Sequence, residues 1–395
     1  MTDEPARKID IVTMGCRWVL DVSDLAPDDA DAMAQRWQRC AGLASAPEAL
    51  RLEDEPISVR VYEGDAPTDV AAGTVLAGAA SRDRVPYALS REITRAGLMR
   101  LRGRATLLHA AALADPADRA LALVAPSGGG KSTATRVLGT RLGYVSDESV
   151  ILLSDGRIAP HPKPPSLVID EEDRFHKEEP SPDALGLGPT PPLPRLTALL
   201  TLSRDPEVVE PAVEEVGLIE QVLAVIPETS STWWLDDGLD RLARAVTSGG
   251  PPSTLRYAEI DTCHELVREH LERAAPVDPT WEHLPAKGAD RLPVGVTDAT
   301  SEEPSGGPLG DEDRVVRAPW SDAIACDGEV LVLAGPRPLR LAGPGAVIWR
   351  AAGGPTTLDE LSECVVAEFG EHPQALDLVR AAVEQLLTHG VLRRF

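Results

Sequence analysis

The chain is poor in aromatic residues and has no cysteine pattern that would bind metal or cross-link the fold. Aromatic residues make up 4% of the 395 residues, and the five cysteines are scattered, without a Cys-x-x-Cys pair or a cluster of zinc-ligand spacing. Cys263 and His264 are adjacent but lack further candidate ligands, which favours a helical pair over a metal site. Reduced thiols in the cytoplasm are the simplest interpretation.

Long hydrophobic runs and clusters of basic residues are also missing. Residues 1–10 are charged and contain no apolar run of the signal-peptide kind, and no segment is long and apolar enough to span a bilayer. The formal net charge is −24, so we expect no nucleic-acid partner and no membrane association. We therefore expect a cytoplasmic protein.

The hydrophobic content, 43%, is ample for buried cores, and the length predicts two or three domains. We expect an α/β fold with four regions. These are residues 1–89 as an N-terminal α/β region, 90–273 as a phosphate-loop domain, 274–313 as a flexible linker rich in acidic residues, Pro and Gly, and 314–395 as a C-terminal domain.

Residues 125–132, which read Ala-Pro-Ser-Gly-Gly-Gly-Lys-Ser, are the most informative stretch. An apolar run at 121–124 predicts a strand before them, and residues 133–142 predict a helix after them. Glycines let the backbone curl until successive N–H groups point at one anion, and the helix N-terminus adds its dipole. The pattern predicts a phosphate-binding loop, although Ala125 replaces the usual first glycine. The expected ATP-binding residues are Ser127, Gly128, Gly129, Gly130, Lys131, Ser132 and Thr133.

The segments around this loop predict a mixed sheet. Residues 106–113 read as a strand, and a short turn at 115–119 returns the chain into the strand at 121–124, which makes an antiparallel hairpin. Ser90 can cap a helix that runs to about residue 102. A further strand is expected at 149–153, and a core strand at 196–202.

Several spaced features resemble the HPr kinase/phosphorylase family, and in particular the HPr-kinase-related serine kinases found beside peptide-modification genes. They are His109 before the loop, the Gly-Lys-Ser that ends it, the acidic pair Asp147-Glu148, and the passage 162–167, Pro-Lys-Pro-Pro-Ser-Leu. The resemblance covers about residues 90–270. It implies the fold shared with phosphoenolpyruvate carboxykinases and ATP-dependent transfer of a phosphoryl group to a hydroxyl. Founding members are oligomeric, which suggests a homo-oligomer.

The resemblance also implies roles for single residues. Asp147 is the expected base, Lys131 the expected phosphate contact, and His109 a group near the transferred phosphate, although a histidine in an apolar strand is more often a core residue. Ser132 and Glu148 are the expected Mg²⁺ ligands. Because neighbouring side chains on a strand point to opposite faces, we expect only one of the two carboxylates to face the acceptor.

The roles of two other residues stay open at this point. Lys163 could approach a nucleotide or product phosphate, or could be an exposed loop lysine. Arg204 is the candidate for the catalytic arginine of the family, although nothing in its surroundings distinguishes it. Glu148 stands where the founding enzymes have a second Asp, and their phosphorylase activity is not carried over.

The C-terminal region resembles the PqqD-like peptide-recognition domain. The matching residues are 339–349, Leu-Arg-Leu-Ala-Gly-Pro-Gly-Ala-Val-Ile-Trp, followed by Gly353-Gly354, 357–361, and Leu386-Leu387 with Gly390. Short strands are expected at 323–326, 329–333 and 338–341, and helices at 344–352, 358–369 and 374–388, with Gly390 as C-cap. The resemblance implies a winged helix-turn-helix that binds the leader of a precursor peptide as an added strand. Residues 314–395 contain no Lys, which argues against DNA binding.

The combined prediction is an ATP- and Mg²⁺-dependent kinase that phosphorylates a Ser or Thr hydroxyl on a ribosomally made precursor peptide, whose leader is bound by residues 314–395. Three alternatives stay open: a kinase of a small metabolite, a kinase of a carrier protein, and a non-catalytic, ATP-gated peptide chaperone.

Overall fold

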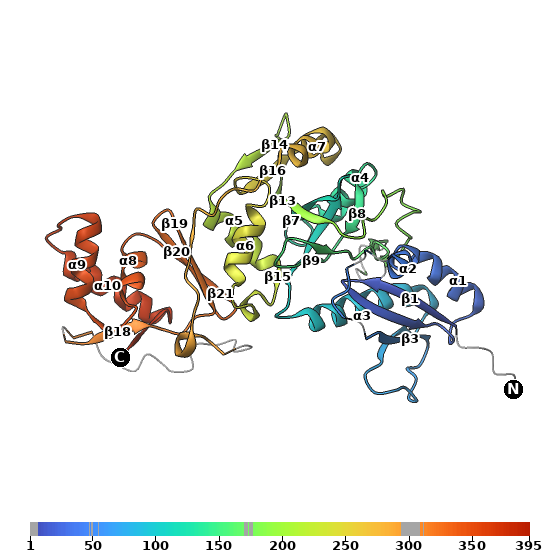
Figure 1. The fold of residues 1–395 in the computed structure, drawn as a ribbon, viewed down its shortest axis with the longest axis horizontal. Helices are drawn as coiled ribbons and strands as arrows, with labels where there is room; N and C mark the ends of the chain where they lie inside the picture. The colour runs from blue at the N-terminus through green and yellow to red at the C-terminus, as the bar shows by residue number, and fades with distance from the viewer. Residues whose placement is uncertain are drawn as a thin grey trace. The chain divides into compact units, whose positions relative to one another are not determined.

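The computed structural model describes residues 7–46, 48, 50–53, 55–169, 173, 177–293, 309–310 and 312–395. They form a mixed α/β protein with two compact units (Figure 1). The first unit comprises Met1–Val216, Pro227–Ser230 and Ala245–Val277, and the second comprises Gly217–Ile226, Ser231–Arg244 and Asp278–Phe395.

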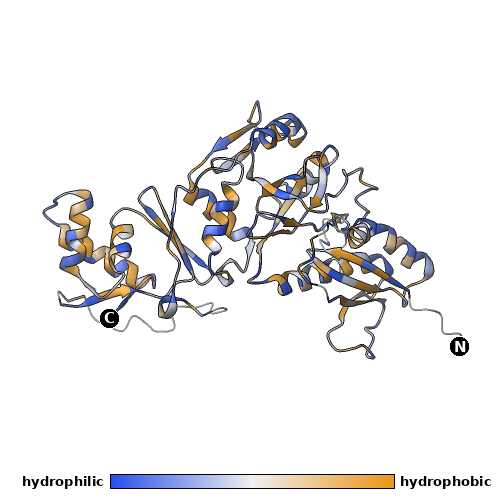
Figure 2. Ribbon diagram, viewed as in Figure 1, coloured by the Kyte–Doolittle hydropathy of each residue, from blue (hydrophilic) through white to orange (hydrophobic). Residues whose placement is uncertain are grey.

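The first unit begins with a four-stranded sheet ordered β1-β2-β3-β4. Strands β1 and β2 form a hairpin whose two turn residues, Met14 and Gly15, have φ of 57° and 70°, as the tight turn between twisted strands requires. Helix α2 packs on β1, and helix α3 packs on β4. Figure 2 shows hydrophobic residues along these strands, and Trp18 and Trp37 are buried in their core. The elements are β1 (Lys8–Thr13), β2 (Cys16–Asp21), α1 (Pro27–Arg36), α2 (Gln38–Ser45), β3 (Ile57–Glu63), β4 (Val75–Ala79), η1 (Arg82–Arg84) and α3 (Val85–Leu101).

Helix α3 corrects the expected cap at Ser90. The helix begins at Val85, with Pro86 in its first turn. Proline is tolerated there because the backbone N–H groups of a first turn have no acceptor within the helix. Ser90 therefore lies inside the helix, buried, and its hydroxyl donates a hydrogen bond to Oε2 of Glu179.

A six-stranded sheet forms the centre of the first unit, in the order β14-β16-β13-β7-β6-β8. β6 pairs antiparallel with β7, whereas β13 pairs parallel with both β7 and β16, so the predicted hairpin and mixed sheet are confirmed. β6 and β7 are almost wholly buried, which explains their continuous apolar sequences. The strands are β6 (Ala110–Ala114), β7 (Arg119–Val124), β8 (Gly143–Ser146), β13 (Arg195–Arg204), β14 (Ala212–Glu215) and β16 (Ser253–Tyr257).

The strand expected at 106–113 is in fact two strands that belong to different sheets. β5 (Thr106–Leu108) lies in a sheet ordered β10-β9-β5-β15, whereas β6 lies in the six-stranded sheet. His109 is the residue between them. The other elements of the first unit are α4 (Lys131–Leu138), β9 (Val150–Leu152), β10 (Ile158–Ala159), β11 (Leu167–Val168), β12 (Lys177–Glu178), β15 (Thr229–Ser230), η4 (Ile260–Cys263) and α7 (His264–Arg273).

The second unit contains a four-stranded antiparallel sheet, a three-stranded sheet ordered β22-β18-β23, and helices. Trp349 and Ile348 are buried, as predicted, and Trp349 meets Trp320 edge to face with ring centres 5.4 Å apart. Its elements are α5 (Leu218–Val225), η2 (Ile226–Glu228), η3 (Thr232–Trp234), α6 (Gly238–Val246), β17 (Glu282–His283), η5 (Gly288–Asp290), β18 (Arg314–Arg317), β19 (Asp322–Cys326), β20 (Glu329–Ala334), β21 (Arg337–Leu341), α8 (Pro344–Ala351), β22 (Thr356–Thr357), α9 (Leu358–Phe369), α10 (Ala375–Thr388) and β23 (Leu392–Arg394); η2 and α6 extend across the boundary into the first unit.

The ends of the last two helices follow their sequence signals. Thr357 and Glu360 form a reciprocal capping box at the start of α9. Gly390 follows α10 with φ of 69°, its N–H donates to the carbonyl of Leu387, and the N–H of Val391 donates to the carbonyl of Leu386. The predicted C-cap is therefore confirmed, in the form of a Schellman motif.

Part of the segment expected as a flexible linker is packed. β17 pairs with β19, and buried Trp281 donates its Nε1 hydrogen to Oδ1 of Asp240 at 2.9 Å. Residues 294–308 and 311 of that segment lie outside the described residues. Within the described ranges, every helix is too short or too polar to cross a bilayer.

Candidate functional site

The loop between β7 and α4 curls tightly, and strand, loop and helix follow one another in the predicted order. Gly128 and Gly130 have φ of 81° and 96°, in the left-handed region that favours glycine. Gly129 is restricted in a different way, because a Cβ there would lie 2.8 Å from the Cβ of Ala125 and 2.9 Å from the carbonyl oxygen of Pro126. All three glycines are thus needed for this backbone path.

Ala125 does not disturb the curl. It is 3% exposed and has an ordinary negative φ, since the tight turning occurs later, at Gly128 and Gly130. The methyl group of Ala125 instead fills the space beside Gly129. The departure from the usual motif is therefore accommodated by the glycine four residues later.

Lys131 begins α4 and is held inside the loop. Its Nζ donates to the carbonyl oxygen of Ala125, and lies 3.4 Å from that of Pro126 and 3.7 Å from Oε2 of Glu228. Burial lowers the pKa of Lys131, and the carboxylate of Glu228 acts in the opposite direction. The ammonium is therefore buried against the loop backbone, between two carbonyl oxygens and the carboxylate of Glu228.

The remaining loop hydroxyls are open to solvent. Ser127, Ser132 and Thr133 are exposed, and among the described residues their side chains have no hydrogen-bond partner. Hydroxyls in the first turn of a helix that follows a glycine-rich loop are available to bind a phosphate or a hydrated cation.

Glu228 is a residue of this site that the sequence did not reveal. Its Oε2 lies 2.9 Å from Nδ1 of His109 and is the same oxygen that faces Lys131. The backbone brings it there, since β15 pairs with β5 and the N–H of His109 donates to the carbonyl of Glu228 at 2.7 Å. His109 is therefore part of this arrangement, with its side chain about 42% exposed, and is not enclosed in a core.

The acidic pair Asp147-Glu148 corrects the expectation that the two carboxylates face apart. Lys163 Nζ lies 3.3 Å from Oδ1 of Asp147 and 3.4 Å from Oε2 of Glu148, so both carboxylates reach one ammonium. The reason is local: β8 ends at Ser146, and the pair lies in the bend beyond it, where strand alternation no longer applies. The hydroxyl of Tyr144 lies 2.8 Å from Oδ1 of Asp147 and fixes that side chain.

Lys163 is buried, with 1% of its side chain exposed, so it is not the exposed loop lysine of the sequence alternatives. Burial opposes its charge, but Asp147, Glu148 and Glu179 together raise the pKa of Lys163 well above the ordinary range. Conversely, Lys163 lowers the pKa of Glu148. The removal of one member of such a buried pair typically costs 3–5 kcal/mol, because an uncompensated charge remains.

A second buried carboxylate, Glu179, extends this cluster. Its Oε1 accepts a hydrogen bond from the hydroxyl of Ser166, and that oxygen atom of Ser166 lies 3.4 Å from Nζ of Lys163. Burial raises the pKa of Glu179 to about 7. Contacts thus run from Glu179 through Ser166 and Lys163 to Asp147.

Arg204, the candidate catalytic arginine, is engaged with residues 258 and 259. It lies at the end of β13 and donates to Oε1 of Glu259 at 2.7 Å and to the carbonyl of Ala258 at 3.0 Å. The structure does not bring it to His109, Lys131 or Asp147 by any contact among the described residues.

The donor set around the loop fits Mg²⁺ better than a transition metal. Ser132 offers an exposed hydroxyl, and the side chain of Glu148 is 47% exposed. Mg²⁺ usually takes one or two protein oxygens and completes its shell with phosphates and water. Within the described ranges, no group of three or more His, Cys, Asp or Glu side chains has the arrangement of a metal site.

Comparison with known proteins leaves this geometry as the basis for assigning function. No family model matches the sequence, and no curated protein matches it.

Proposed function

We propose that this protein is an ATP- and Mg²⁺-dependent kinase of the HPr-kinase-like class that phosphorylates a Ser or Thr hydroxyl. The observation that carries the proposal is the curled loop 125–130 ahead of α4, with Lys131 packed against the loop carbonyls and beside the carboxylate of Glu228. Phosphoryl transfer depends on positioned phosphates and on charge stabilisation, which this arrangement supplies.

The reaction would use these residues as follows. The loop amides and Lys131 bind the β- and γ-phosphates, and Ser132 and Glu148 would hold Mg²⁺, which neutralises phosphate charge. The acceptor oxygen forms a bond to the γ-phosphorus while the bond from that phosphorus to the β,γ-bridging oxygen breaks, which leaves ADP. Asp147 takes the proton of the acceptor hydroxyl.

The acceptor is proposed to be a ribosomally made precursor peptide whose leader binds residues 314–395. Support comes from β21, which forms an edge of its sheet and so presents unpaired backbone groups to an added strand. In that arrangement, the unit that holds the leader raises the effective concentration of the acceptor at the kinase site. The resemblance of 314–395 to PqqD-like domains motivates this part of the proposal.

The test is phosphate transfer from γ-labelled ATP to a panel of Ser- and Thr-containing peptides, with MgATP binding measured by calorimetry. Lys131→Met should lower kcat by about 10²- to 10³-fold, because it removes one preorganised positive charge and keeps the buried stem. Glu228→Gln should lower kcat by about 10-fold or more, because it removes the carboxylate that orients His109 and Lys131.

Lys8→Ala is the matched control, since Lys8 is exposed on β1 and lies outside this site. Its activity should equal that of the wild type. Equal labelling by Lys131→Met would exclude the catalytic assignment. MgATP binding without transfer to any peptide would instead favour the ATP-gated chaperone.

A further inference from the structure

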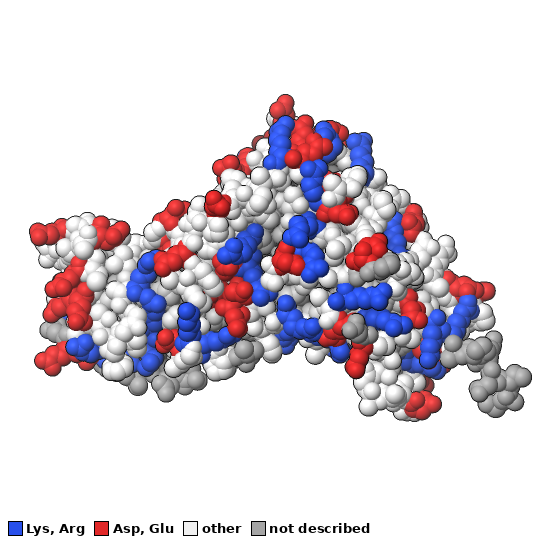
Figure 3. All heavy atoms as spheres, in the orientation of Figure 1, with Lys and Arg blue, Asp and Glu red and all other residues white. Residues whose placement is uncertain are grey.

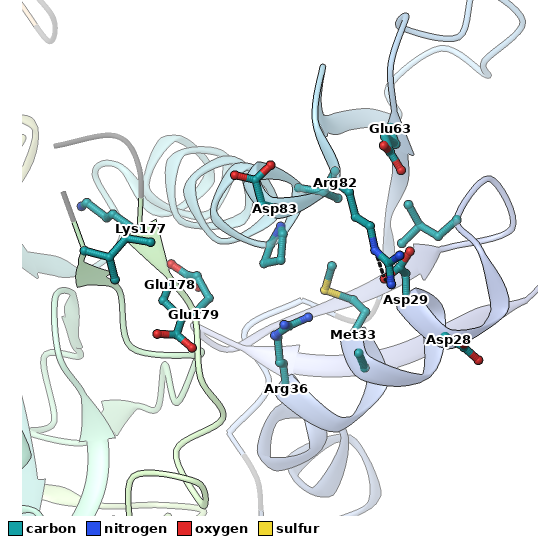
Figure 4. Close-up of a pocket in the computed structure, with 15 residues that line it drawn as sticks. Asp28, Asp29, Met33, Arg36, Glu63, Arg82, Asp83, Lys177, Glu178 and Glu179 are labelled. Carbon is teal, nitrogen blue, oxygen red and sulfur yellow. Dashed lines mark hydrogen bonds and ion pairs between the residues drawn. The ribbon is translucent and has the colours of Figure 1, made fainter. Parts of the chain in front are cut away.

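A cavity of about 510 Å³ lies in the first unit, and no residue of the loop 125–132 lines it. Its walls come from one face of α1, from the junction between η1 and α3, and from the segment around β12 (Figure 4). Its volume lies within the range, roughly 300–1,000 Å³, of sites that bind small molecules or several side chains at once. It is therefore larger than a site for a single ion needs to be.

The walls carry an excess of negative charge. Among the described residues, six acidic and three basic side chains line the cavity. Arg82 is already paired, since its Nε donates to Oδ1 of Asp29 at 2.6 Å, as Figure 4 shows. Lys177 is placed over the ring of Tyr87, 4.7 Å from its centre. Because the acidic side chains outnumber the basic ones, the lining as a whole has a negative charge.

The cavity also has an apolar part. Met33, which is 2% exposed, forms part of the wall from α1, and Val85 and Pro86 form part of the wall from α3. A thioether side chain adapts its shape to different apolar partners. At another side, Ile169 remains 54% exposed. A complementary occupant therefore combines an apolar stem with a positively charged end, as Lys and Arg side chains do.

A series of side-chain contacts links one wall of the cavity to Asp147, the proposed base. Glu179 belongs to the cavity lining and shares Ser166 with Lys163, which in turn contacts Asp147. This series of contacts runs through the protein interior, because only 1% of the Lys163 side chain and 7% of the Asp147 side chain are exposed. A nucleotide is a poor candidate for this cavity, because its phosphates would be repelled by the excess of carboxylates.

We propose that this cavity binds the Arg or Lys side chain of a peptide substrate. The inference rests on the proposed function for its biological meaning, but binding can be measured without ATP. The shared chemistry, a cation on an apolar stem, could also come from a free basic amino acid, and the experiment separates the two.

The experiment is calorimetry on the full chain without nucleotide, with three probes: acetyl-Ala-Arg-Ala-amide, the same peptide with citrulline, and arginine amide. Citrulline keeps the shape of arginine and removes its charge. We expect the arginine peptide to bind at least 10-fold more tightly than either of the other probes. Equal binding of the citrulline peptide would overturn the cation site, and equal binding of arginine amide would overturn the peptide assignment.

Variants locate the binding. Asp28→Asn combined with Glu63→Gln should lower the affinity for the arginine peptide at least 5-fold, because both carboxylates line the cavity. Glu207→Gln is the matched control, since it removes one exposed carboxylate that does not line the cavity, and it should leave the affinity unchanged. An equal loss in the control would overturn the proposal, as general acidity would then explain the binding.

Lys131→Met separates this proposal from the proposed kinase function. The variant should keep the arginine-peptide affinity of the wild type. If that affinity is lost, the peptide binds at the nucleotide loop and the cavity assignment is overturned. A wild-type protein that binds the peptide but transfers no phosphate would contradict the kinase alone.

Discussion

At the scale of single residues, the first unit buries a histidine between two threonine hydroxyls. His161 is fully buried between Thr13 and Thr94, with Nδ1 2.6 Å from one hydroxyl and Nε2 3.0 Å from the other. Thr94 already donates to the carbonyl of Ser90, so Nε2 carries the hydrogen and Nδ1 accepts from Thr13. This arrangement holds a neutral imidazole.

The neutral imidazole predicts a loss of stability in acid. Burial lowers the pKa of His161 to about 3 from an ordinary 6.5, so below pH 6.5 the unfolded chain binds a proton that the folded chain does not. The stabilisation is present above pH 6.5 and is lost as the pH falls toward 3. His161→Gln should be less stable than the wild type at pH 7.5, and that gap should narrow by about 2 kcal/mol at pH 5.

Urea unfolding at the two pH values measures the gap. Glu179, whose burial raises its pKa to about 7, has the opposite pH dependence between 4.5 and 7, but it is present in both proteins and cancels in the difference. Met99→Leu, an exposed substitution that removes no titratable group, is the control and should show a constant gap. A constant gap for His161→Gln would contradict the assignment of a neutral histidine.

The residues that sequence reasoning identified are those with short-range signals. The glycine spacing in residues 125–132 predicts a tightly curled loop, and the structure has positive φ at Gly128 and Gly130. Glu228 has no such signal, because it is 119 residues from His109 in the sequence. Only the pairing of the two-residue strand β15 with β5 brings the two residues together. Glu179 and Lys163 likewise lie in irregular segments, where burial follows from tertiary contacts and not from periodicity.

At the scale of elements, the β6-β7 hairpin and the end of α10 were predictable, whereas the start of α3 and the strand break at His109 were not. The hairpin β6-β7 and the Schellman ending of α10 follow from turn and cap residues. The break at His109 does not, since β5 and β6 are both apolar and differ only in the sheet that each joins. A continuous apolar sequence predicts a buried strand, but it does not indicate the residue at which the chain leaves one sheet and joins another.

The capping box of α9 gives a prediction at this scale. Thr357→Ala removes the side-chain oxygen that accepts from the N–H of Glu360, and it should cost about 1 kcal/mol in the local stability of the helix. Hydrogen exchange of the first-turn amides of α9 measures the effect, with an expected acceleration of about 5-fold. Thr388→Ala is the control, because the hydroxyl of Thr388 bonds only to the carbonyl of Glu384 within α10. Unchanged exchange in α9 would show that the cap is not stabilising.

At the scale of the whole molecule, charge is dispersed. Figure 3 shows basic and acidic side chains interspersed on the face it draws, with acidic ones gathered at the helical end of the second unit. The expectation of no nucleic-acid partner, which comes from the formal net charge of −24, stays a prediction. Each unit has its own hydrophobic core.

Removal of the C-terminal region should therefore disturb more than that region. The N–H groups of Leu239 and Asp240 donate to Oδ2 of Asp322, at 2.8 and 3.4 Å, and Trp281 bonds to Asp240. A chain that ends at residue 277 should be cleaved by protease within 217–244, whereas the full chain should resist. Comparable resistance of both chains would show that this stretch is stable by itself. Point substitutions in β21 are consequently a cleaner test of leader binding than truncation.

The interleaved order of the two units has a consequence for the history of the gene and for its engineering. The polypeptide passes between the units several times, so no single crossover point separates them. A recombination event at the acidic Pro/Gly segment would transfer an incomplete module, and a productive exchange must carry residues 217–226 and 231–244 along with the C-terminal stretch. Grafting the second unit onto another protein thus requires a split insertion and not a simple end-to-end fusion.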